Sequence, residues 1–283
     1  MILFAVLPLV LIVLVGPAAA SRMLRSAQGR PVEEFALRMR SAFGRVGGFV
    51  LTVAAGAGIA LAIGWPLGVL ARRMDPADHT AFTWVRARAD THWLASAMKI
   101  LTQMGNNRET QILTVVASVL IGLIWARARG ARFGLLPPAV LLVAYELEHQ
   151  LQVALLHLAH RGHPPTTLGT YPSGGCARLV LTWGLIAYLL AVIFGKTRSV
   201  AGYLAVTFVA AAAYIEGFSR VYLSKHWVSD VVGGWIFGSV LLVVMIAATR
   251  VLDHGAATSG SGRHGREHDV SRTYAGAAPM RGK

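Results

Sequence analysis

Residues 219–249 read SRVYLSKHWVSDVVGGWIFGSVLLVVMIAAT, a short polar stretch followed by a long apolar run. The apolar part, 228–249, has the length that one helix needs to cross a bilayer, about 20 residues. Six further apolar segments can be drawn along the chain, and most reach the same length. They lie near 2–20, 47–71, 110–126, 134–158, 179–195 and 199–217. The sequence therefore predicts an all-α, polytopic membrane bundle.

The composition agrees with a membrane protein. Of the 283 residues, 55% are hydrophobic and only 14% are charged, which is too apolar for an ordinary soluble domain. The net charge of +14 would suggest nucleic acid in a soluble protein, but here the basic residues flank apolar segments. We therefore expect no nucleic-acid partner. A single cysteine, Cys176, excludes an intramolecular disulfide and a thiolate metal cluster.

Charges in the connections predict the orientation in the membrane. Four basic regions, 21–45, 126–132, 196–198 and the C-terminal tail, fall on one side when seven helices are threaded, so that side is expected to be cytoplasmic. In the first three regions these residues are Arg22, Arg25, Arg30, Arg38, Arg40, Arg45, Arg127, Arg129, Arg132, Lys196 and Arg198. The connections 72–108, 159–177 and 218–227 then face outward. We expect a multi-pass protein of the plasma membrane whose polar motif lies on the extracytoplasmic side.

The remaining stretches complete the predicted organisation. Residues 1–21 are expected to be an N-terminal membrane anchor, although the segment ends in a sequence that mimics a signal-peptide cleavage site. A basic cytoplasmic linker at 22–46, a membrane domain at 47–250 and a disordered basic cytoplasmic tail at 251–283 follow. The long 72–108 connection predicts one or two amphipathic helices at the membrane interface.

The polar stretch holds Arg220, His226 and Asp230. His226 and Asp230 lie four residues apart and share a face if the segment is helical. An aspartate so placed can hold an imidazole in one tautomer and leave its other nitrogen free to attack or to move a proton. Arg220 supplies a positive fork suited to a phosphate group. Spacing alone equally allows plain polar decoration of a helix start.

A second polar cluster occupies the outward connection at 159–178. It contains Arg161, Arg178 and the run Tyr171-Pro172-Ser173-Gly174-Gly175. A serine and backbone N–H groups at a helix N-terminus can bind an anion, although the same run can be an ordinary serine cap. Because both outward connections bring an arginine to one membrane face, together they favour an anion site.

These motifs resemble those of the type 2 phosphatidic acid phosphatase (PAP2) superfamily. Ser219-Arg220, five residues, His226, three residues and Asp230 resemble its third motif, and Pro172-Ser173-Gly174 resembles most of its second, Pro-Ser-Gly-His. Arg161 is similar to the arginine of the first, Lys-x6-Arg-Pro. Residues 98–105, MKILTQMG, resemble the stretch ahead of the family's second core helix. The resemblance implies a six-helix core over about 47–250, with the N-terminal membrane helix added.

The resemblance also implies roles. His226 would be the nucleophile that forms a phosphohistidine, and Asp230 would orient its ring. The phosphate would be bound by Arg220, Arg161, Ser219, Ser173 and the N–H of Gly174. Arginines and backbone donors then supply the electrostatic stabilisation, so no metal or other cofactor is expected.

Two departures from the family pattern bear on catalysis. Gly175 stands where the second motif has the histidine that protonates the leaving group, and Ala154 and Gly162 replace the lysine and proline of the first motif. Loss of a general acid costs about 10²–10⁴-fold in rate. The candidates for a substitute acid or phosphate ligand are His160, His163, His157 and Arg178.

The segment 134–158 carries further polar residues for a membrane helix. By their spacing, Glu146, His149, Gln150 and His157 share one broad face, which we expect to point into the bundle or towards a site. Polar residues satisfied inside the bundle or at the interface are an equal alternative. A metal site formed by this face is a much weaker one.

Two functions remain open on the sequence. The first is a phosphatase or phosphotransferase that acts on a lipid phosphate at the outer leaflet, with a phosphatidic acid-like lipid or a polyprenyl phosphate or diphosphate as substrate. The second is a catalytically impaired relative that binds or transports a lipid phosphate. Gly175 favours the second function, and the intact third motif favours the first.

Overall fold

The computed structural model describes residues 2–27, 30–89, 92–165, 169–197 and 199–253, and within these ranges it contains helices and no strand. The long helices are α1 (Ile2–Ala27), α2 (Arg30–Arg73), α5 (Asn107–Arg129), α6 (Leu136–Ala159), α7 (Gly174–Ile193), α8 (Val200–Tyr222) and α9 (Val228–Asp253). The short ones are α3 (Asp75–Arg86), α4 (His92–Leu101) and the 3-10 turn η1 (Ala131–Phe133).

Six of the described helices are long and apolar enough to cross a membrane: α2, α5, α6 with η1, α7, α8 and α9. The prediction of an all-α, multi-pass membrane bundle with six core helices is confirmed. The N-terminal helix α1 packs along α8, where Gly16 lies against Thr207. Its described apolar part, Val6–Ala18, is shorter than the six spans.

The segment predicted as a basic linker is largely helical. α2 begins at Arg30 and runs to Arg73, with one break at Gly44, where φ is 70°. A positive φ is a conformation that glycine adopts more readily than other residues, so the kink falls where the sequence permits it. The tail predicted to be disordered lies outside the described residues from position 254 onward.

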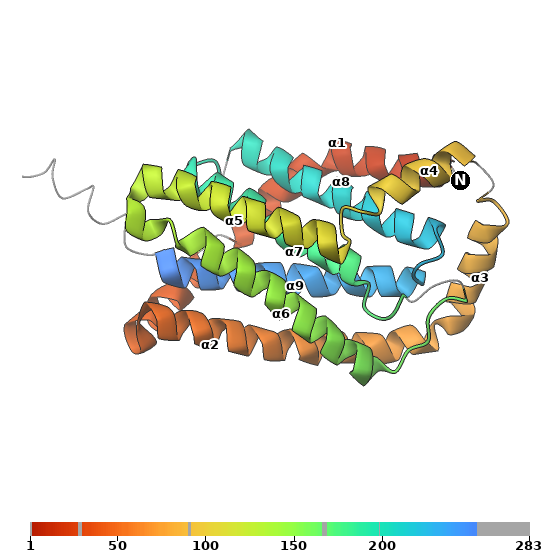
Figure 1. The fold of residues 1–283 in the computed structure, drawn as a ribbon, viewed down its shortest axis with the longest axis horizontal. Helices are drawn as coiled ribbons and strands as arrows, with labels where there is room; N and C mark the ends of the chain where they lie inside the picture. The colour runs from red at the N-terminus through yellow and green to blue at the C-terminus, as the bar shows by residue number, and fades with distance from the viewer. Residues whose placement is uncertain (1, 28–29, 90–91, 166–168, 198, 254–283) are drawn as a thin grey trace, which may run out of the picture.

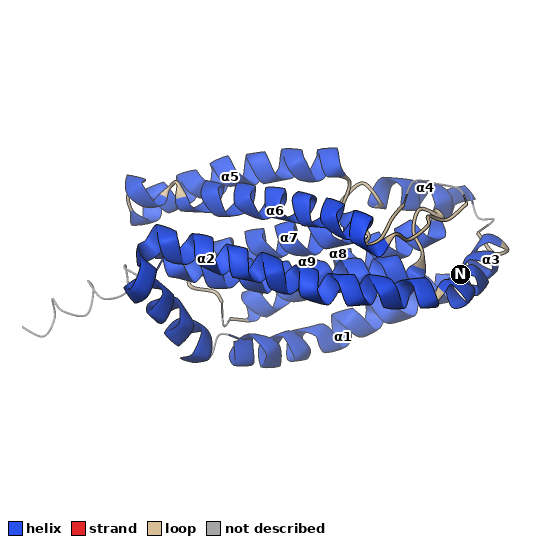
Figure 2. Ribbon diagram, turned by 90° about the horizontal axis from the view of Figure 1, so that it is seen from below, coloured by secondary structure: helices blue, strands red, loops and turns tan. Residues whose placement is uncertain are grey.

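Helix α7 lies at the centre of the bundle and packs against α5, α6, α8 and α9, while α2 lies along α9 (Figures 1 and 2). The core around α7 is aliphatic and fully buried, with Leu181, Leu185 and Leu189 meeting Leu241 and Met245 of α9. In a membrane bundle such close packing of side chains, rather than hydrophobic burial, holds helices together.

The connections divide between the two ends of the bundle (Figure 1). α3, α4, the 160–173 connection and the α8–α9 connection share one end, and the α5–α6 and α7–α8 connections share the other. The three connections predicted to face outward therefore come together. The prediction of one or two helices within 72–108 is also confirmed, because α3 and α4 occupy it.

Small residues let α9 approach the start of α7. A side chain at Gly234 would collide with the carbonyl of Ser173, and one at Gly238 with the backbone of Ala177. The close approach brings the first turn of α9, which carries Asp230, beside the N-terminus of α7. The backbone N–H of Ser173 donates to the carbonyl of Asp230 at 3.0 Å.

Candidate active site at one end of the bundle

His226 and Asp230 meet where the α8–α9 connection enters α9. Nδ1 of His226 lies 3.6 Å from Oδ2 of Asp230, which is an ion-pair distance and longer than a hydrogen bond. Oδ2 accepts the N–H of Trp227 at 3.1 Å, and Oδ1 accepts from Arg161 at 2.8 Å. Both side chains are buried, and Asp230 is fully so. Two hydrogen bonds thus fix the carboxylate of Asp230 beside the imidazole.

Burial lowers the pKa of His226 below its ordinary value, because a buried site disfavours the charged imidazolium. The carboxylate of Asp230 raises the pKa of His226 and so opposes the effect of burial. The positive charges of Arg220 and Lys225 lower it further. The net direction is downward. His226 is therefore neutral near pH 7 and keeps a lone pair for attack on an electrophile.

Arg161 lies in a cluster of carboxylates, not at an open anion site. Its Nη1 donates to Asp230 and to the hydroxyl of Ser229, at 2.8 and 2.5 Å. Its Nη2 donates to Asp78 at 2.5 Å and to Asp75 at 3.1 Å. The side chain is 1% exposed. Both terminal nitrogens of the arginine predicted to bind phosphate are thus already occupied by carboxylates.

Arg220 has a different environment. Its Nε donates to Oε1 of Glu216 at 2.7 Å, and its Nη2 donates to the carbonyl of Thr102 at 3.1 Å and to Oδ1 of Asn106 at 2.9 Å. Among the residues that the structure describes, Nη1 has no hydrogen-bond partner. One nitrogen of the fork therefore remains available to a ligand.

The guanidinium of Arg220 also fills the space beside Gly175. A Cβ atom built at Gly175 would lie 2.5 Å from Nη2 of Arg220, which is closer than non-bonded atoms come. A histidine at position 175 would have to displace this arginine. The absence of a side chain at Gly175 thus makes room for the guanidinium of Arg220.

Arg178 lies across the α4–α5 turn from Arg220. It donates to Glu148 at 3.4 Å, to Gln152 at 3.3 Å and to the carbonyl of Gly105 at 3.3 Å. Glu148 is fully buried, and its Oε1 has no partner among the described residues. The turn that the sequence resemblance singled out at 98–105 therefore separates two buried arginine–glutamate pairs.

The other predicted phosphate ligands are held by internal hydrogen bonds. The hydroxyl of Ser173 donates to Sγ of Cys176 at 3.4 Å, and that of Ser219 donates to the carbonyl of Glu216 at 2.6 Å. Both serines are fully buried. Gly174 faces the amide of Gln152. The structure brings these residues to the same end of the bundle as His226, where both serine side chains are buried.

The histidines considered as substitute acids lie at the surface. His157, His160 and His163 are all exposed, and His160 ends α6 with a positive φ of 47°. Nδ1 of His163 lies 2.8 Å from the neighbouring carbonyl of Pro164. Within the described part of the chain, none of the three hydrogen-bonds to a residue around His226 or Arg220.

The expectation that the polar face of α6 points into the bundle was wrong, whereas the alternative of a position at the interface agrees with its exposed side chains. Glu146, Gln150 and His157 are exposed and His149 is half-buried, whereas Glu148 points into the bundle. The reason is the position of Arg178 on α7, because a buried arginine draws the glutamate that can neutralise it. Among the described residues no three His, Cys, Asp or Glu side chains are arranged to hold a metal ion.

Sequence reasoning missed several residues of this end. They are Asp75, Asp78, Asn106, Glu216 and Ser229. Glu216 could have been found, because it is an ionisable residue in an apolar helix, four positions before Arg220. No signal in the sequence connects Asp78 with Arg161.

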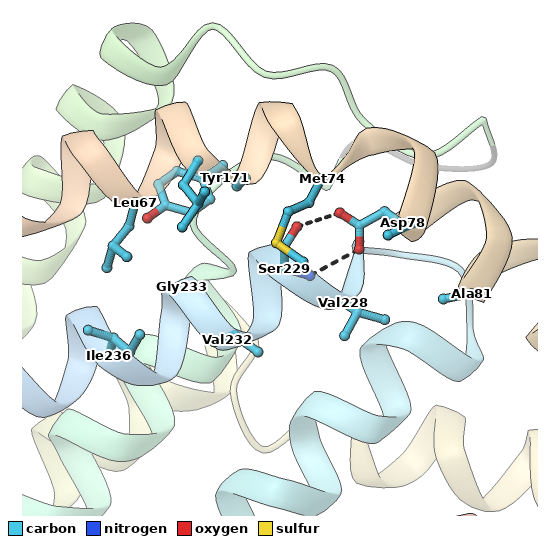
Figure 3. Close-up of a pocket in the computed structure, with 13 residues that line it drawn as sticks. Leu67, Met74, Asp78, Ala81, Tyr171, Val228, Ser229, Val232, Gly233 and Ile236 are labelled. Atoms are coloured by element: carbon cyan, nitrogen blue, oxygen red, sulfur yellow. Dashed lines mark hydrogen bonds between the residues drawn. The ribbon is translucent and has the colours of Figure 1, made fainter.

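A groove of about 360 Å³ opens beside the Arg161 cluster (Figure 3). It runs between α2, α3 and α9, and most of its wall is apolar. Leu67, Met74, Val232 and Ile236 contribute to that wall, while Asp78 and Ser229, which are hydrogen-bonded to each other, mark its polar side.

Comparison with known proteins gives a family and a fold. The model of the PAP2 superfamily matches residues 133–253. A crystal structure of a transmembrane PAP2 type phosphatidylglycerolphosphate phosphatase from Bacillus subtilis is similar with a TM-score of 0.55 and 22% sequence identity. The match covers 66% of this chain and 93% of that chain. No curated protein matches the chain. The sequence of residues 133–253 is therefore similar to the PAP2 superfamily, and the helical bundle has the fold of a membrane PAP2 protein.

Proposed function

We propose that this protein is an integral membrane phosphatase or phosphotransferase that acts on a lipid phosphate through a phosphohistidine intermediate. The observation that carries the proposal is the buried imidazole of His226, whose Nδ1 lies 3.6 Å from Oδ2 of Asp230. The PAP2 superfamily match supports it, as does the similar fold of a phosphatidylglycerolphosphate phosphatase, whose substrate is a lipid phosphate.

In this mechanism the residues divide the work. His226 attacks the phosphorus atom through Nε2, and Asp230 stabilises the positive charge that the ring then carries. Arg220 binds a phosphate oxygen through Nη1 and stabilises the charge that builds up in the transition state. Arg161, whose terminal nitrogens are held by carboxylates, positions Asp230. Arg178 serves as a second cation near the site and takes the place of the missing lysine.

The substrate class follows from the surroundings. The apolar groove between α2, α3 and α9 suits the hydrocarbon chain of a lipid, in the form of a phosphatidic acid-like molecule or a polyprenyl phosphate or diphosphate. We further propose that the site faces the extracytoplasmic side of the plasma membrane, on the charge distribution of the connections. The division into an anchor at 1–21, a linker at 22–46, a membrane domain at 47–250 and a tail at 251–283 belongs to the same proposal.

Trapping of the phosphoenzyme tests the function. Purified protein in detergent is mixed with a ³²P-labelled lipid phosphate, quenched in alkali and examined for acid-labile label on the chain. We expect label and phosphate release in the wild type and neither in His226→Ala, since loss of a nucleophile costs on the order of 10⁴-fold or more. The matched control is His92→Ala, an exposed histidine of α4 at the same end. Equal turnover in the His226 variant would exclude the mechanism.

One set of observations favours the alternative, a lipid-phosphate binder or transporter without turnover. Gly175 carries no acid, and Arg161, Arg178 and Arg220 are each paired with a carboxylate. Such a protein would bind a lipid phosphate without releasing phosphate and without acquiring label. The same trapping experiment, combined with a binding measurement, separates the two functions.

A further inference from the structure

Glu216 is a buried carboxylate that the proposed roles leave unused. It lies on α8 with no exposed surface. Its Oε1 accepts from Nε and Nη2 of Arg220 at 2.7 and 2.6 Å. Its Oε2 has no hydrogen-bond partner among the described residues. A buried, unpaired oxygen is costly in a native structure and calls for an explanation.

The position of Glu216 is related to the missing histidine. A side chain at Gly175 would extend towards Nη2, Cζ and Nε of Arg220, which lie 2.5, 2.8 and 2.9 Å from its Cβ. Glu216 binds the same Nε–Nη2 edge of that guanidinium. A histidine at position 175 and the carboxylate of Glu216 therefore approach the phosphate-binding arginine from one side.

We infer that Glu216 is the general acid of the reaction and takes over the role of the histidine that Gly175 replaces. This inference rests on the proposed phosphatase function. In the free protein the charge of Arg220 neutralises Glu216. A phosphate bound at Nη1 of Arg220 brings a competing negative charge, and a buried carboxylate beside a second anion favours its protonated form. Substrate binding thus loads the acid with a proton.

The chemistry balances over two steps. Nε2 of His226 forms a bond to phosphorus as the bond from phosphorus to the leaving oxygen breaks, and that oxygen takes the proton of Glu216 and departs as an alcohol. In the second step the carboxylate of Glu216 accepts a proton from water, the water oxygen bonds to phosphorus, and the bond between nitrogen and phosphorus breaks. Inorganic phosphate leaves, the imidazole of His226 is neutral again, and Glu216 returns to water the proton it took up on substrate binding as its pair with Arg220 forms again.

The other candidates fit this role less well. His157, His160 and His163 are exposed, and none has a hydrogen bond to Arg220 among the described residues. Glu148 is equally buried and also has an unpaired oxygen, but it is bound to Arg178, which lies one helical turn beyond Gly175 on α7. Only Glu216, among the described carboxylates, shares Arg220 with Gly175.

A comparison of leaving groups tests the inference. Dodecyl phosphate releases a basic alkoxide that needs a proton, whereas p-nitrophenyl phosphate releases a stable anion that does not. In Glu216→Gln we expect turnover of dodecyl phosphate to fall by about 10²–10⁴-fold and that of p-nitrophenyl phosphate by less than about tenfold. Glu146→Gln, an exposed glutamate of α6, is the matched control and should leave both rates unchanged.

Each result is decisive. Equal losses on both substrates, or no loss on either, would overturn the role of Glu216. If Glu216→Gln fails to elute as folded protein, Glu216→Asp keeps the charge and withdraws the carboxyl group by one methylene. The ratio of dodecyl to p-nitrophenyl turnover should then fall at least tenfold, by the same argument, and an unchanged ratio would overturn the inference. Absence of any His226-dependent turnover in the wild type would instead reject the phosphatase function itself.

Discussion

Arg161 and Arg220 are both predicted from the sequence to bind phosphate, yet their surroundings differ. Arg161 is 1% exposed and gives both terminal nitrogens to carboxylates and a serine. Arg220 is bound to one carboxylate, a backbone carbonyl and an amide, and it keeps Nη1 without a partner in the described part of the chain. The first arginine is a structural centre, and the second retains capacity for a ligand.

The difference shows that a motif residue type does not settle its role. The same guanidinium fork can join a connection to two helices or bind a phosphate, depending on the carboxylates that reach it. Arg161 connects the 160–173 connection to α3 through Asp78 and to α9 through Asp230. Its removal leaves two buried carboxylates, Asp78 and Asp230, without a counter-charge and should act mainly on stability. Removal of Arg220 leaves one, Glu216, and also removes the free Nη1, so it should lower stability less and act on the rate of catalysis as well.

The largest expected effect is that of Arg161→Gln on stability. The substitution leaves Asp78 and Asp230 buried without a counter-charge, and loss of one partner of a buried ion pair costs about 3–5 kcal/mol. We expect a markedly lower midpoint of thermal unfolding in detergent. Arg129→Gln, which removes a half-buried pair with Asp253 at the opposite end, serves as control and should cost less. An unchanged midpoint in the Arg161 variant would show that the cluster does not hold this end together.

Arg220→Gln should act mainly on rate. Loss of one preorganised donor to a developing negative charge costs about 10²–10³-fold in turnover. We expect kcat/KM for a lipid phosphate to fall by that factor while the variant still elutes as folded protein. Arg220→Lys keeps the charge without the fork and should recover only part of the loss. If the midpoint of thermal unfolding of Arg220→Gln were as low as that of Arg161→Gln, the distinction between the two arginines would be lost.

The helices were predictable because the physics that forms them is local. Apolar runs of membrane length, interrupted by arginines and glycines, placed all six core spans. The His226–Asp230 pair was predictable for the same reason, since a separation of four residues on a helix start brings the side chains together. The Gly175 departure was also visible in the sequence.

The pairing of charges was not predictable, because it depends on contacts between distant segments. Asp78 and Arg161 are 83 positions apart and meet only through the fold. Glu148, not Glu146, faces inward because Arg178 of another helix lies there. Periodicity gives the faces of a helix, and only the neighbouring helices decide which face is buried.

A smaller effect separates Asp78 from Asp75. Asp78 is buried and accepts from Arg161 and from the N–H and hydroxyl of Ser229, whereas the side chain of Asp75 is 53% exposed. Asp78→Asn should cost about 1–3 kcal/mol because it weakens charge-assisted hydrogen bonds in a buried site. Asp75→Asn should cost less than about 1 kcal/mol, as exposed ion pairs do. Equal shifts of the unfolding midpoint in the two variants would show that Asp78 and Asp75 contribute equally to stability.

The smallest expected effect is a displacement of the pH profile. The pKa of His226 is lowered from the ordinary value of 6.5, first by burial, and only the neutral ring can attack. The value of kcat/KM should therefore be maximal near pH 7 and fall at lower pH, with a midpoint below pH 6.5. Asp230 raises the pKa of His226 through its hydrogen-bonding group and charge, so Asp230→Asn should move this midpoint to still lower pH while it reduces the rate. Both profiles are measured as kcat/KM on one substrate, so that ionisation of the phosphate affects them equally. A midpoint that moves upward in the variant would mean that Asp230 does not act on the imidazole, and the contact at 3.6 Å would have no part in the charge state of the nucleophile.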